Sequence, residues 1–550
     1  MAQGHTAPGA LLLVLHAHLP YVRHLGGALP LEADWLPEAV AGTYLPLLEV
    51  LERLFEDGVA VRFTLSISPT LLAMLSDRVL QAQVGLWLKL QRELWEREVR
   101  RTAKDASLGP VARYHQQRLG HLVRRWEEHH RAELVPAFLR AEHDGQVALV
   151  TSAATHAFLP LLRHLEVALR GQLRVGVQEH ARLLGGRPRG FWLPECGYFP
   201  GLERWLAEEE LRFTFLEARG VVLAQPRPLA SVYAPLFTES GVAVYGRDPE
   251  SSEEVWSAEC GYPADPAYLD FHKDAAWELP LSALEPVLRP FEPRRALGLR
   301  YHRVTGRTEE KALYAPEPAQ KQARAHARHF VERRRARLGE LAPRMGRPPV
   351  LVAPYDAELF GHWWHEGPVF LEALFREASA QGLCVRTPLE DLAEFEVAQQ
   401  AVPAESSWGT EGSARTWLDP SNDWIPPEVH RATRALAAEA EALTRRTPQT
   451  RKLLDQACRE LLLAQSSDFP FILRAGTVVD YARSRVRTHL RRFWALLDTA
   501  QGRPADAAAV QEAFAEDILF PDLEFRMFAP PPQQAGKARE TSAVMPADKA

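Results

Sequence analysis

The stretch Leu11-Leu12-Leu13-Val14-Leu15-His16-Ala17-His18 decides the fold. Its five consecutive aliphatic residues are typical of a parallel strand buried on both faces, because a strand with one solvated face alternates apolar and polar residues. A helical pattern over residues 44–56 follows it. A strand followed by a helix is the repeating unit of a parallel α/β sheet or barrel.

Similar short β-type runs recur through the first 390 residues. We expect strands near 61–65, 147–151, 190–193, 212–216, 242–245, 349–353 and 384–386. Helical patterns between many of these runs, such as 201–210, predict a parallel α/β barrel. The irregular spacing predicts two insertions. One is charged and mostly helical, over about 77–144; the other, over about 249–347, is rich in prolines and aromatics and is expected to cover the barrel mouth.

The character of the sequence changes after about residue 397. Helical segments near 427–445, 450–465 and 476–497 predict an all-α C-terminal domain over 397–528, following a catalytic domain over 1–396. The last stretch, 529–550, contains Pro530-Pro531-Pro532 and no apolar periodicity. We predict that this tail is disordered, because it cannot bury enough apolar surface to fold.

Composition excludes several classes of protein. The chain has 550 residues, and its 46% hydrophobic and 25% charged content is ordinary for a globular enzyme. A net charge of −6 gives no reason to expect a nucleic-acid or membrane partner. The start lacks the features of a secretion signal, and the four cysteines lack the spacing of a disulfide framework or zinc site. We expect a cytoplasmic protein, either a monomer or a homodimer.

Two carboxylates end short apolar runs among aromatic residues: Glu195 in Gly190-Phe191-Trp192-Leu193-Pro194-Glu195, and Asp356 in Pro354-Tyr355-Asp356. Such a pair is what glycosidic bond chemistry needs, because one group protonates the leaving oxygen while the other attacks the sugar carbon or activates water. Aromatic rings nearby can stack on the apolar faces of sugars. These residues alone do not assign the two roles.

Each carboxylate has an alternative interpretation. Glu195 could cap the following helix, but Trp192, Pro194 and Tyr198 form an apolar frame that would shift the pKa of a carboxyl group by desolvation. Glu358 could replace Asp356. Because Asp356 directly follows the predicted strand, we place it at the strand tip and Glu358 beside it.

Histidines follow two of the predicted strands. His16 and His18 end the first, His156 follows the third, and the C-terminal ends of barrel strands share one face, so these side chains should converge with the carboxylates. His-x-His could begin a metal site, but a third and fourth ligand would be needed. Possible donors are His156, Asp356, His362 and His365. We favour hydrogen bonding to sugar hydroxyls and carboxylates, and predict no metal.

The tryptophans fall into two groups. Trp87, Trp95 and Trp126 lie in the charged helical insertion, where packing is the expected role. Trp408 and Trp417 lie in a polar, glycine-containing loop without core periodicity. We expect these two to stack on sugars.

Taken together, these motifs resemble glycoside hydrolase family 57, and within it the 1,4-α-glucan (glycogen) branching enzymes. The resemblance is carried by His16-Ala17-His18-Leu19-Pro20, Trp192-Leu193-Pro194-Glu195, Tyr355-Asp356-Ala357-Glu358-Leu359-Phe360-Gly361-His362-Trp363-Trp364, Gly246-Arg247-Asp248-Pro249-Glu250 and Ser467-Asp468-Phe469-Pro470-Phe471. It implies an α/β fold: an incomplete (β/α)7 TIM-like barrel with helical insertions and an all-α C-terminal domain that completes a glucan-binding groove.

The resemblance also implies a reaction. Glu195 would be the nucleophile and Asp356 the general acid and then base of a retaining double displacement, with carboxyl groups about 5–5.5 Å apart. Transfer of the chain to a 6-hydroxyl would create an α-1,6 branch. The partner would be an α-glucan such as amylose, maltodextrin or glycogen, and no cofactor is needed because side chains handle the protons and the covalent intermediate.

By the same resemblance, Tyr233 would stand at the tip of a lid that excludes water. The other residues expected to bind the glucan are His16, His18, Trp35, His156, Arg247, Trp256, Ala264, Trp363, Trp408, Trp417 and Asp468. The sequence departs from the family pattern at Ala264, where glycine is usual, at Arg219, where histidine is expected, at His302, where tryptophan is common, and near Ala28, where a tryptophan is missing. These departures put acceptor preference and transferred chain length in doubt.

Three rival functions remain open. A 4-α-glucanotransferase or α-amylase-type hydrolase of the same family would use the same carboxylates but another acceptor. A non-catalytic glucan-binding protein would bind without turnover. A metal-dependent deacetylase or mannosidase-like hydrolase, suggested by the paired histidines, would lose activity with chelators.

Overall fold

The computed structural model describes residues 8–25, 30–257, 259–285, 287–288, 293–395, 399–442 and 446–529. Within these residues one sheet runs in the order β6-β7-β5-β4-β3-β2-β1-β8, and β9 pairs with β1. All neighbouring strands are parallel except β6 and β7. The strands are β1 (Ala10–Ala17), β2 (Phe63–Ile67), β3 (Val147–Ser152), β4 (Gly190–Trp192), β5 (Phe213–Leu216), β6 (Leu236–Phe237), β7 (Ala243–Gly246), β8 (Val350–Asp356) and β9 (Cys384–Val385).

The sheet is curved so that β7 and β8, near its two ends, come together, and in the described residues a single isolated bridge links them. Arg247, directly after β7, forms an isolated parallel bridge with Val352 of β8, and the Asp248 N–H donates to the Val352 carbonyl oxygen at 2.8 Å. In the described part of the chain, seven parallel strands therefore form an incomplete barrel. The predicted fold class is confirmed.

Alternate residues of β1 face opposite sides of the barrel wall, as the pleat of a strand requires. Leu11, Leu13 and Leu15 pack in the outer core with the helices. Ala10, Leu12 and Val14 belong to a separate inner cluster, together with Val150, Trp192, Phe213, Phe215, Tyr245, Val350 and Val352. The alternation continues past the apolar run, so His16 projects into the barrel. The same alternation in β8 turns Asp356 inward.

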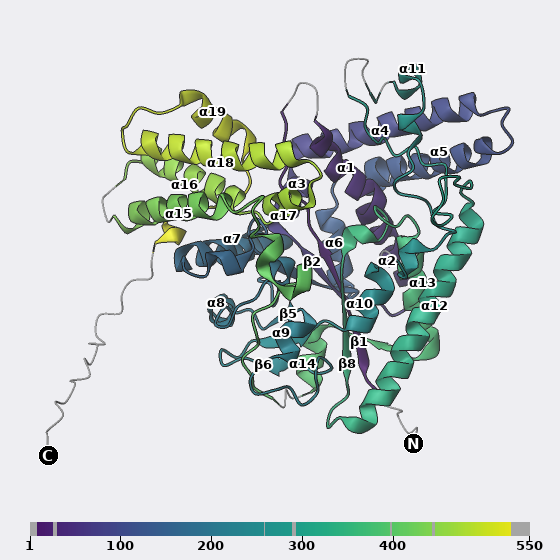
Figure 1. Cartoon of the computed structure of the whole chain (residues 1–550), viewed down its shortest axis with the longest axis horizontal. Helices are drawn as coiled ribbons and strands as arrows, with labels where there is room; N and C mark the ends of the chain where they lie inside the picture. Colours follow the sequence, from purple (N-terminus) through teal and green to yellow (C-terminus); the bar gives the residue numbers. More distant parts are fainter. Residues whose placement is uncertain are drawn as a thin grey trace.

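The helices of the first 395 residues wrap this barrel (Figure 1). Between β2 and β3 the chain forms a mostly helical excursion, whose α4 and α5 run side by side (Figure 1). The helices are α1 (Trp35–Ala39), α2 (Leu45–Glu56), α3 (Pro69–Ser76), α4 (Arg78–Arg101), α5 (Leu108–Arg124), α6 (Val135–His143), α7 (Glu166–Leu184), α8 (Glu203–Glu208), α9 (Ala218–Val222), α10 (Pro249–Trp256), α11 (Leu281–Leu284), α12 (Pro316–Leu341), α13 (Gly367–Gln381) and α14 (Pro388–Glu394).

The long helix α12 lies within the insertion predicted over 249–347, but it packs on α13 and on β8 at the side of the barrel (Figure 1). It is therefore the crossover helix that leads into β8, as a parallel strand connection requires. The sequence did not predict this role because the helix is highly charged, with Arg333-Arg334-Arg335, and lacks a clear apolar stripe.

The chain beyond residue 424 is helical, as predicted, and lies beside the upper end of the barrel (Figure 1). It contains α15 (Ile425–Glu441), α16 (Pro448–Ala464), α17 (Asp468–Ala475), α18 (Val479–Ala500) and α19 (Ala507–Glu516). The short helices α17 and α19 were not expected, because eight to ten residues give little periodicity. Most of the predicted tail, 530–550, and the predicted boundary at 397 lie outside the described residues.

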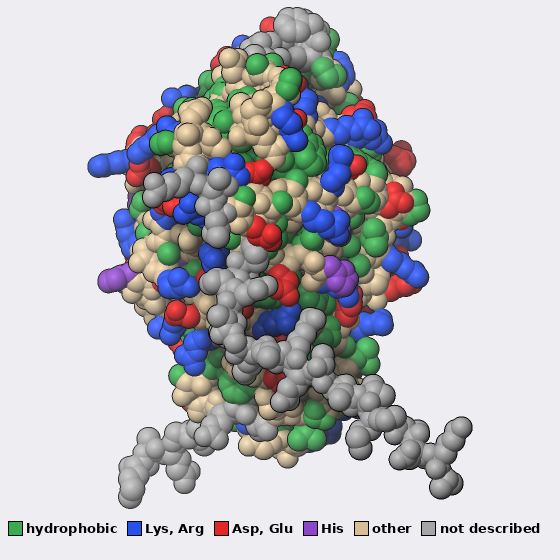
Figure 2. Space-filling view, turned by 90° about the vertical axis from the view of Figure 1, so that its left-hand side faces the viewer, with side chains coloured by type: hydrophobic (Ala, Val, Ile, Leu, Met, Phe, Trp, Pro, Cys, Tyr) green, Lys and Arg blue, Asp and Glu red, His purple; other side chains and the backbone are tan. Residues whose placement is uncertain are grey.

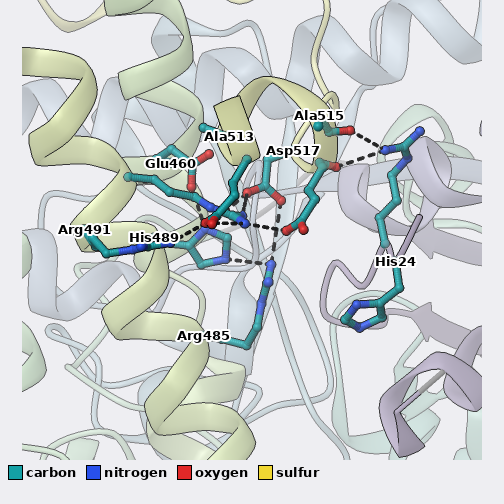
Figure 3. Close-up of polar contacts among 12 residues, drawn as sticks. His24, Glu460, Arg485, His489, Arg491, Ala513, Ala515 and Asp517 are labelled. Atoms are coloured by element: carbon teal, nitrogen blue, oxygen red, sulfur yellow. Dashed lines mark hydrogen bonds and ion pairs between the residues drawn. The ribbon is translucent and has the colours of Figure 1, made fainter. Parts of the chain in front are cut away.

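A buried polar cluster fastens this helical region together (Figure 3). His489 Nδ1 lies 2.7 Å from Glu460 Oε2, and Arg492 donates to Asp517 at 2.7 Å; all four side chains are buried. Next to this cluster, Arg23 donates to the Ala515 carbonyl oxygen at 2.7 Å. Arg23 lies on the loop that follows β1, so the helices are tied to the segment that carries His18.

The surface has no single dominant charge on the face seen in Figure 2, where acidic and basic side chains are interspersed. Each of the four cysteines, all of them in described residues, is a free thiol. Among the described helices, none is long and apolar enough to cross a membrane.

Candidate active site

The predicted polar residues meet at the C-terminal ends of the barrel strands. His16 and Asp356 are register partners on β1 and β8, and His16 is also the partner of Ser66 on β2. Glu195 lies just beyond β4. This convergence follows from parallel pairing, because strands that run in one direction bring their ends to one edge.

Glu195 is held in an unusual backbone conformation. Its φ of 61° and ψ of 21° lie in the left-handed region, and Cys196 and His156 also have positive φ values, of 51° and 56°. Such conformations cost energy for residues other than glycine and persist where the surroundings impose them. The turn directs the Glu195 carboxylate toward the C-terminal half of the chain.

Two residues from that half donate hydrogen bonds to the carboxylate. Trp408 Nε1 donates to Glu195 Oε2 at 2.7 Å, and Ser467 Oγ donates to Glu195 Oε1 at 2.8 Å. Both oxygens are thereby oriented. Burial raises the pKa of Glu195, whereas these two hydrogen bonds act to lower it by stabilising the ionised form.

Asp356 has a different environment. No described residue donates a hydrogen bond to its side chain, and burial, reinforced by the charges of Glu358 and Glu195, raises the pKa of Asp356 to about 8. Asp356 is therefore protonated at neutral pH, while Glu195 has two donors that favour its anion. Carboxyl groups in such different surroundings can divide the roles of proton donor and anion between them.

Glu358 lies beside this pair and not between its members. Its Oε1 accepts hydrogen bonds from the Tyr44 hydroxyl and from the His18 N–H, the latter at 3.1 Å. Burial raises its pKa to about 7. The expected choice of Asp356 as the strand-tip residue is confirmed by the end of β8 at Asp356.

The histidines form a compact stack. His16 Nε2 lies 2.9 Å from His156 Nε2, and the rings of His18 and His156 stack with centroids 3.8 Å apart. His18, His156 and Asp468 offer donor atoms within 4.8 Å of one another. Ring lone pairs lie in the ring planes, however, and two stacked rings tilted by only 16° cannot both aim at one ion. This arrangement fits hydrogen bonding better than metal binding.

Asp468 pairs with His18. Both of its carboxylate oxygens lie 3.1 Å from His18 Nε2, and His18 Nδ1 lies 2.9 Å from Ser68 Oγ. The pKa of His18 is raised, since the Asp468 charge and hydrogen bond outweigh burial. The neighbouring His16 and His156 are fully buried, and their pKa values fall well below the ordinary value.

Aromatic and basic side chains surround Trp408. Its ring packs against Trp192 at 5.1 Å and Trp256 at 6.4 Å, and the guanidinium of Arg247 lies 5.9 Å from its centroid. Arg219 donates to the Glu411 carbonyl oxygen at 3.2 Å and so supports the loop that carries Trp408. Trp256 is 37% exposed, which leaves its ring available to a ligand.

Three further predicted residues have the following local contacts. Trp363 is 52% exposed and packs against Phe271 at 4.5 Å, as a sugar-stacking residue would. Trp35 meets Tyr481 of α18 edge-on at 5.2 Å. Ala264 ends a short turn, where its N–H donates to the Gly261 carbonyl oxygen, and it has no hydrogen bond to the two carboxylates.

The structure places Tyr233 beside the first residue of β8, and its role as a lid residue stays a prediction. The Tyr233 carbonyl oxygen accepts from the Val350 N–H at 2.9 Å, and its hydroxyl accepts from Arg337 at 2.9 Å. Val350 begins β8 and Asp356 ends it. Tyr233 is therefore held six residues before Asp356 along β8, and a Cβ on Gly246, which ends β7, would lie 3.0 Å from the side chain of the preceding Val232.

Trp417, which we expected to stack on a sugar, is buried. It is 1% exposed and stacks on Phe158 at 4.2 Å. A Cβ at Gly409 would lie 2.7 Å from the Trp417 ring, so this glycine lets the loop that follows Trp408 close over it. Trp417 therefore packs against the loop on its buried side, while Trp408 contacts Glu195.

Several contributing residues were not singled out by the sequence. Ser467 was quoted only as part of a motif, and Ser66, Ser68 and Tyr44 were not noted at all. Ser66 and Ser68 repeat the two-residue spacing of His16 and His18 on the adjacent strand. That matched spacing was the available signal, but it becomes informative only when the pairing of β1 with β2 is known.

Comparison with known proteins agrees with this geometry. Residues 12–403 match the model of glycosyl hydrolase family 57, and residues 428–528 match that of the 1,4-alpha-glucan branching enzyme C-terminal region. A 1,4-alpha-glucan branching enzyme of Thermococcus kodakarensis is 32% identical over 524 residues, covering 88% of this chain and 73% of that protein. A probable 1,4-alpha-glucan branching enzyme of Mycobacterium tuberculosis is 32% identical over 553 residues, covering 94% and 98%.

Two solved structures are similar over nearly their whole length. The alpha-amylase AmyC of Thermotoga maritima superposes with a TM-score of 0.88 at 35% identity, covering 95% of this chain and 99% of that one. A family 57 branching enzyme of Pyrococcus horikoshii superposes with a TM-score of 0.86 at 30% identity, covering 96% and 98%. The chain belongs to glycosyl hydrolase family 57.

Proposed function

We propose that this chain is a 1,4-α-glucan branching enzyme that cleaves an α-1,4-glucan and transfers the released chain to a 6-hydroxyl. One observation carries the proposal: Ser467, inside the region that matches the branching-enzyme model, hydrogen-bonds the carboxylate of Glu195 at 2.8 Å. The barrel and the helical region therefore act on one carboxylate. The relatives named as branching enzymes support the same conclusion.

The reaction follows from the two carboxyl environments. The Glu195 carboxylate attacks C1 of a glucose unit while Asp356, protonated at neutral pH, gives its proton to the departing 4-oxygen. Asp356 is then ionised. It takes the proton of an acceptor 6-hydroxyl, whose oxygen attacks C1 and releases Glu195. Two inversions retain the configuration.

The glucan would be held by residues around this centre. Trp256, Trp363 and Trp408 would supply ring faces, and Trp35, Arg247 and Ala264 would contribute further contacts. His18, His156 and Asp468 would hydrogen-bond sugar hydroxyls, with His16 behind them. No resident metal or cofactor is part of this proposal, because side chains carry each proton.

A direct test is proton NMR of amylose incubated with the purified protein, counting α-1,6 linkages against new reducing ends. Many branches with few reducing ends are expected. Redistributed chains without branches would mean a 4-α-glucanotransferase. The Glu195→Gln variant should bind amylose and leave it unchanged; if it turned over normally, Glu195 would not be the nucleophile.

A second candidate, α-amylase-type hydrolysis, is favoured by the structural likeness to AmyC, named an alpha-amylase. In the NMR experiment, reducing ends without α-1,6 signals would establish hydrolysis, and both signals together would mean that water competes with the acceptor.

We further propose that the substrate in the cell is glycogen and that the enzyme works in the cytoplasm. Four free thiols support this location, since oxidising compartments favour disulfides. Loss of the protein should leave cellular glycogen with fewer α-1,6 linkages. Unchanged branching would contradict the assignment to glycogen biosynthesis.

The division into a catalytic barrel over 1–396, a helical domain over 397–528 and a tail over 529–550 remains a prediction. The donors to Glu195 support treating the first two as one catalytic unit. Removal of residues 530–550 should leave glucan turnover intact, and a large loss would contradict the assignment of that stretch as a disordered tail.

A further inference from the structure

A continuous chain of hydrogen bonds leads from inside the barrel to Glu195. Ser66 Oγ lies 3.0 Å from His16 Nδ1, and His16 Nε2 lies 2.9 Å from His156 Nε2. His156 Nδ1 lies 2.9 Å from Ser467 Oγ, which donates to Glu195 Oε1 at 2.8 Å. The four links involve five side chains from five segments, and all but Glu195 are buried.

We propose that Ser467 is a positioning residue for Glu195, and that the Ser66, His16 and His156 chain behind it fixes the direction in which its hydroxyl points. The inference rests on the proposed role of Glu195 as nucleophile. It goes beyond that role by assigning the orientation of the nucleophile to the helical region and the proton on each histidine to a stated nitrogen.

The direction of every bond follows from the first. An ionised carboxylate can only accept, so Ser467 must give its single proton to Glu195. The His156 Nδ1 must then carry a proton and donate to Ser467. A neutral imidazole has only one N–H. His156 Nε2 therefore accepts a hydrogen bond, which His16 donates from its Nε2–H.

The same argument completes the chain. With its proton on Nε2, a neutral His16 accepts at Nδ1 from the Ser66 hydroxyl. Burial keeps both rings neutral, since it lowers their pKa values well below the ordinary value. Each of the four donors therefore points along the chain toward Glu195, and all four favour its ionised form.

The fold holds Ser467 in place through the backbone. Ser466 and Ala157 form an antiparallel bridge, and the Ser467 N–H donates to the His156 carbonyl oxygen at 3.0 Å. Nearby, the Gln172 side chain donates to that of Gln465 at 2.8 Å. The junction of α16 and α17 is thus fastened to the loop after β3.

A second set of backbone contacts holds Trp408, the other hydrogen-bond donor to Glu195. Ser406 and Tyr198 form an antiparallel bridge, and the Trp408 N–H donates to the Glu195 carbonyl oxygen at 3.0 Å. Both donors to the carboxylate thus lie beyond residue 403, where the match to the family model ends. The C-terminal part of the chain orients the nucleophile and does more than extend the substrate site.

The kinetic test compares Ser467→Ala with Ser467→Thr, which keeps the hydroxyl. Loss of a hydrogen bond to a charged group should lower kcat for glucan cleavage by about 10- to 100-fold with little change in KM. The acid limb of the kcat/KM profile should move about one unit to higher pH, because the Glu195 anion loses a donor. The threonine variant should recover most of kcat.

The titratable groups facing Glu195 in that profile are Asp356, Asp468, His18 and His156, whose Nδ1 lies 3.8 Å from Glu195 Oε1, and the substitution replaces none of them. Ser484→Ala, on the exposed face of α18, is the matched control and should behave as wild type. An alanine variant with wild-type kcat and an unmoved acid limb would overturn the positioning role. So would a threonine variant as slow as alanine but folded by circular dichroism.

Neutron diffraction of the deuterium-exchanged wild-type protein tests the chain without any activity. Deuterium is expected on His156 Nδ1 and His16 Nε2, with none on His156 Nε2. Deuterium on His156 Nε2 instead would overturn the assigned direction. If the wild type turned over no glucan, the proposed function would fail, while this measurement would still decide the hydrogen-bond chain.

Discussion

Trp408 contacts Glu195 twice: its indole Nε1 lies 2.7 Å from Oε2, and its backbone nitrogen lies 3.0 Å from the Glu195 carbonyl oxygen. The loop that carries Trp408 is therefore fixed to both the backbone and the side chain of Glu195. Because Glu195 has a left-handed φ of 61°, these contacts also help to hold a turn that is unfavourable by itself.

Trp408→Phe should keep the ring but remove the indole donor. We expect kcat to fall about 10- to 100-fold and the acid limb of the pH profile to move upward, since the ionised form of Glu195 loses a charge-assisted hydrogen bond. The same change at Trp277, which is 53% exposed, is the control. Equal losses in both variants would mean that the effect is not specific to Glu195.

Activity should fall as pH rises through about 8. The pKa of Asp356 is raised to about 8, and a general acid works only while protonated. Glu358→Gln removes one of the charges that raise this pKa, so the alkaline limb of kcat/KM should move to lower pH. Steady-state rates between pH 5 and 10 on maltoheptaose measure both effects; an unmoved limb in the glutamine variant would contradict the coupling.

Asp356 should also reduce stability as pH rises. Its folded pKa of about 8 lies above the ordinary pKa of 3.8, so the folded state binds more protons than the unfolded state between these values, and stability falls across that window. Asp356→Asn removes this dependence. Its Tm should exceed that of wild type by about 1–3 °C at pH 8 and by less at pH 5, measured by calorimetry. The opposite ordering would contradict the raised pKa.

Trp417 and Trp363 should separate stability from binding. Trp417→Ala empties a buried site that is 1% exposed and should destabilise by about 3–5 kcal/mol in denaturant unfolding. Trp363→Ala, at a side chain 52% exposed, should leave stability within about 0.5 kcal/mol and raise KM for amylose. A stable Trp417 variant with weakened glucan binding would restore Trp417 as a sugar platform.

Tyr233→Phe should not alter the ratio of branching to hydrolysis. The substitution removes the hydrogen bond from Arg337 but leaves the backbone contact of residue 233 with Val350, the first residue of β8. The NMR ratio of α-1,6 linkages to reducing ends should equal that of wild type, with at most a small loss of Tm. A shift toward hydrolysis would mean that the loop reaches the carboxylates during turnover.

By itself, the sequence determined the barrel and its two carboxylates. Continuous apolar runs such as 11–15 are the signature of strands buried on both faces, and the residues that end such strands share one face of the barrel. His16, Glu195 and Asp356 could therefore be chosen from local pattern alone. An error in the prediction of any other strand would have left these three residues the same.

Only the tertiary structure decided which distant residues complete the site and which do not. Ser467 contacts Glu195 although 272 residues separate them in the chain. Tyr233 and Trp417 were equally plausible site residues by sequence, but Tyr233 lies beside the start of β8 and Trp417 lies in the core. The difference arises because strand pairing and the seams between segments are long-range contacts with no local signature. Burial, which sets the pKa of Asp356, is likewise a property of the packed molecule.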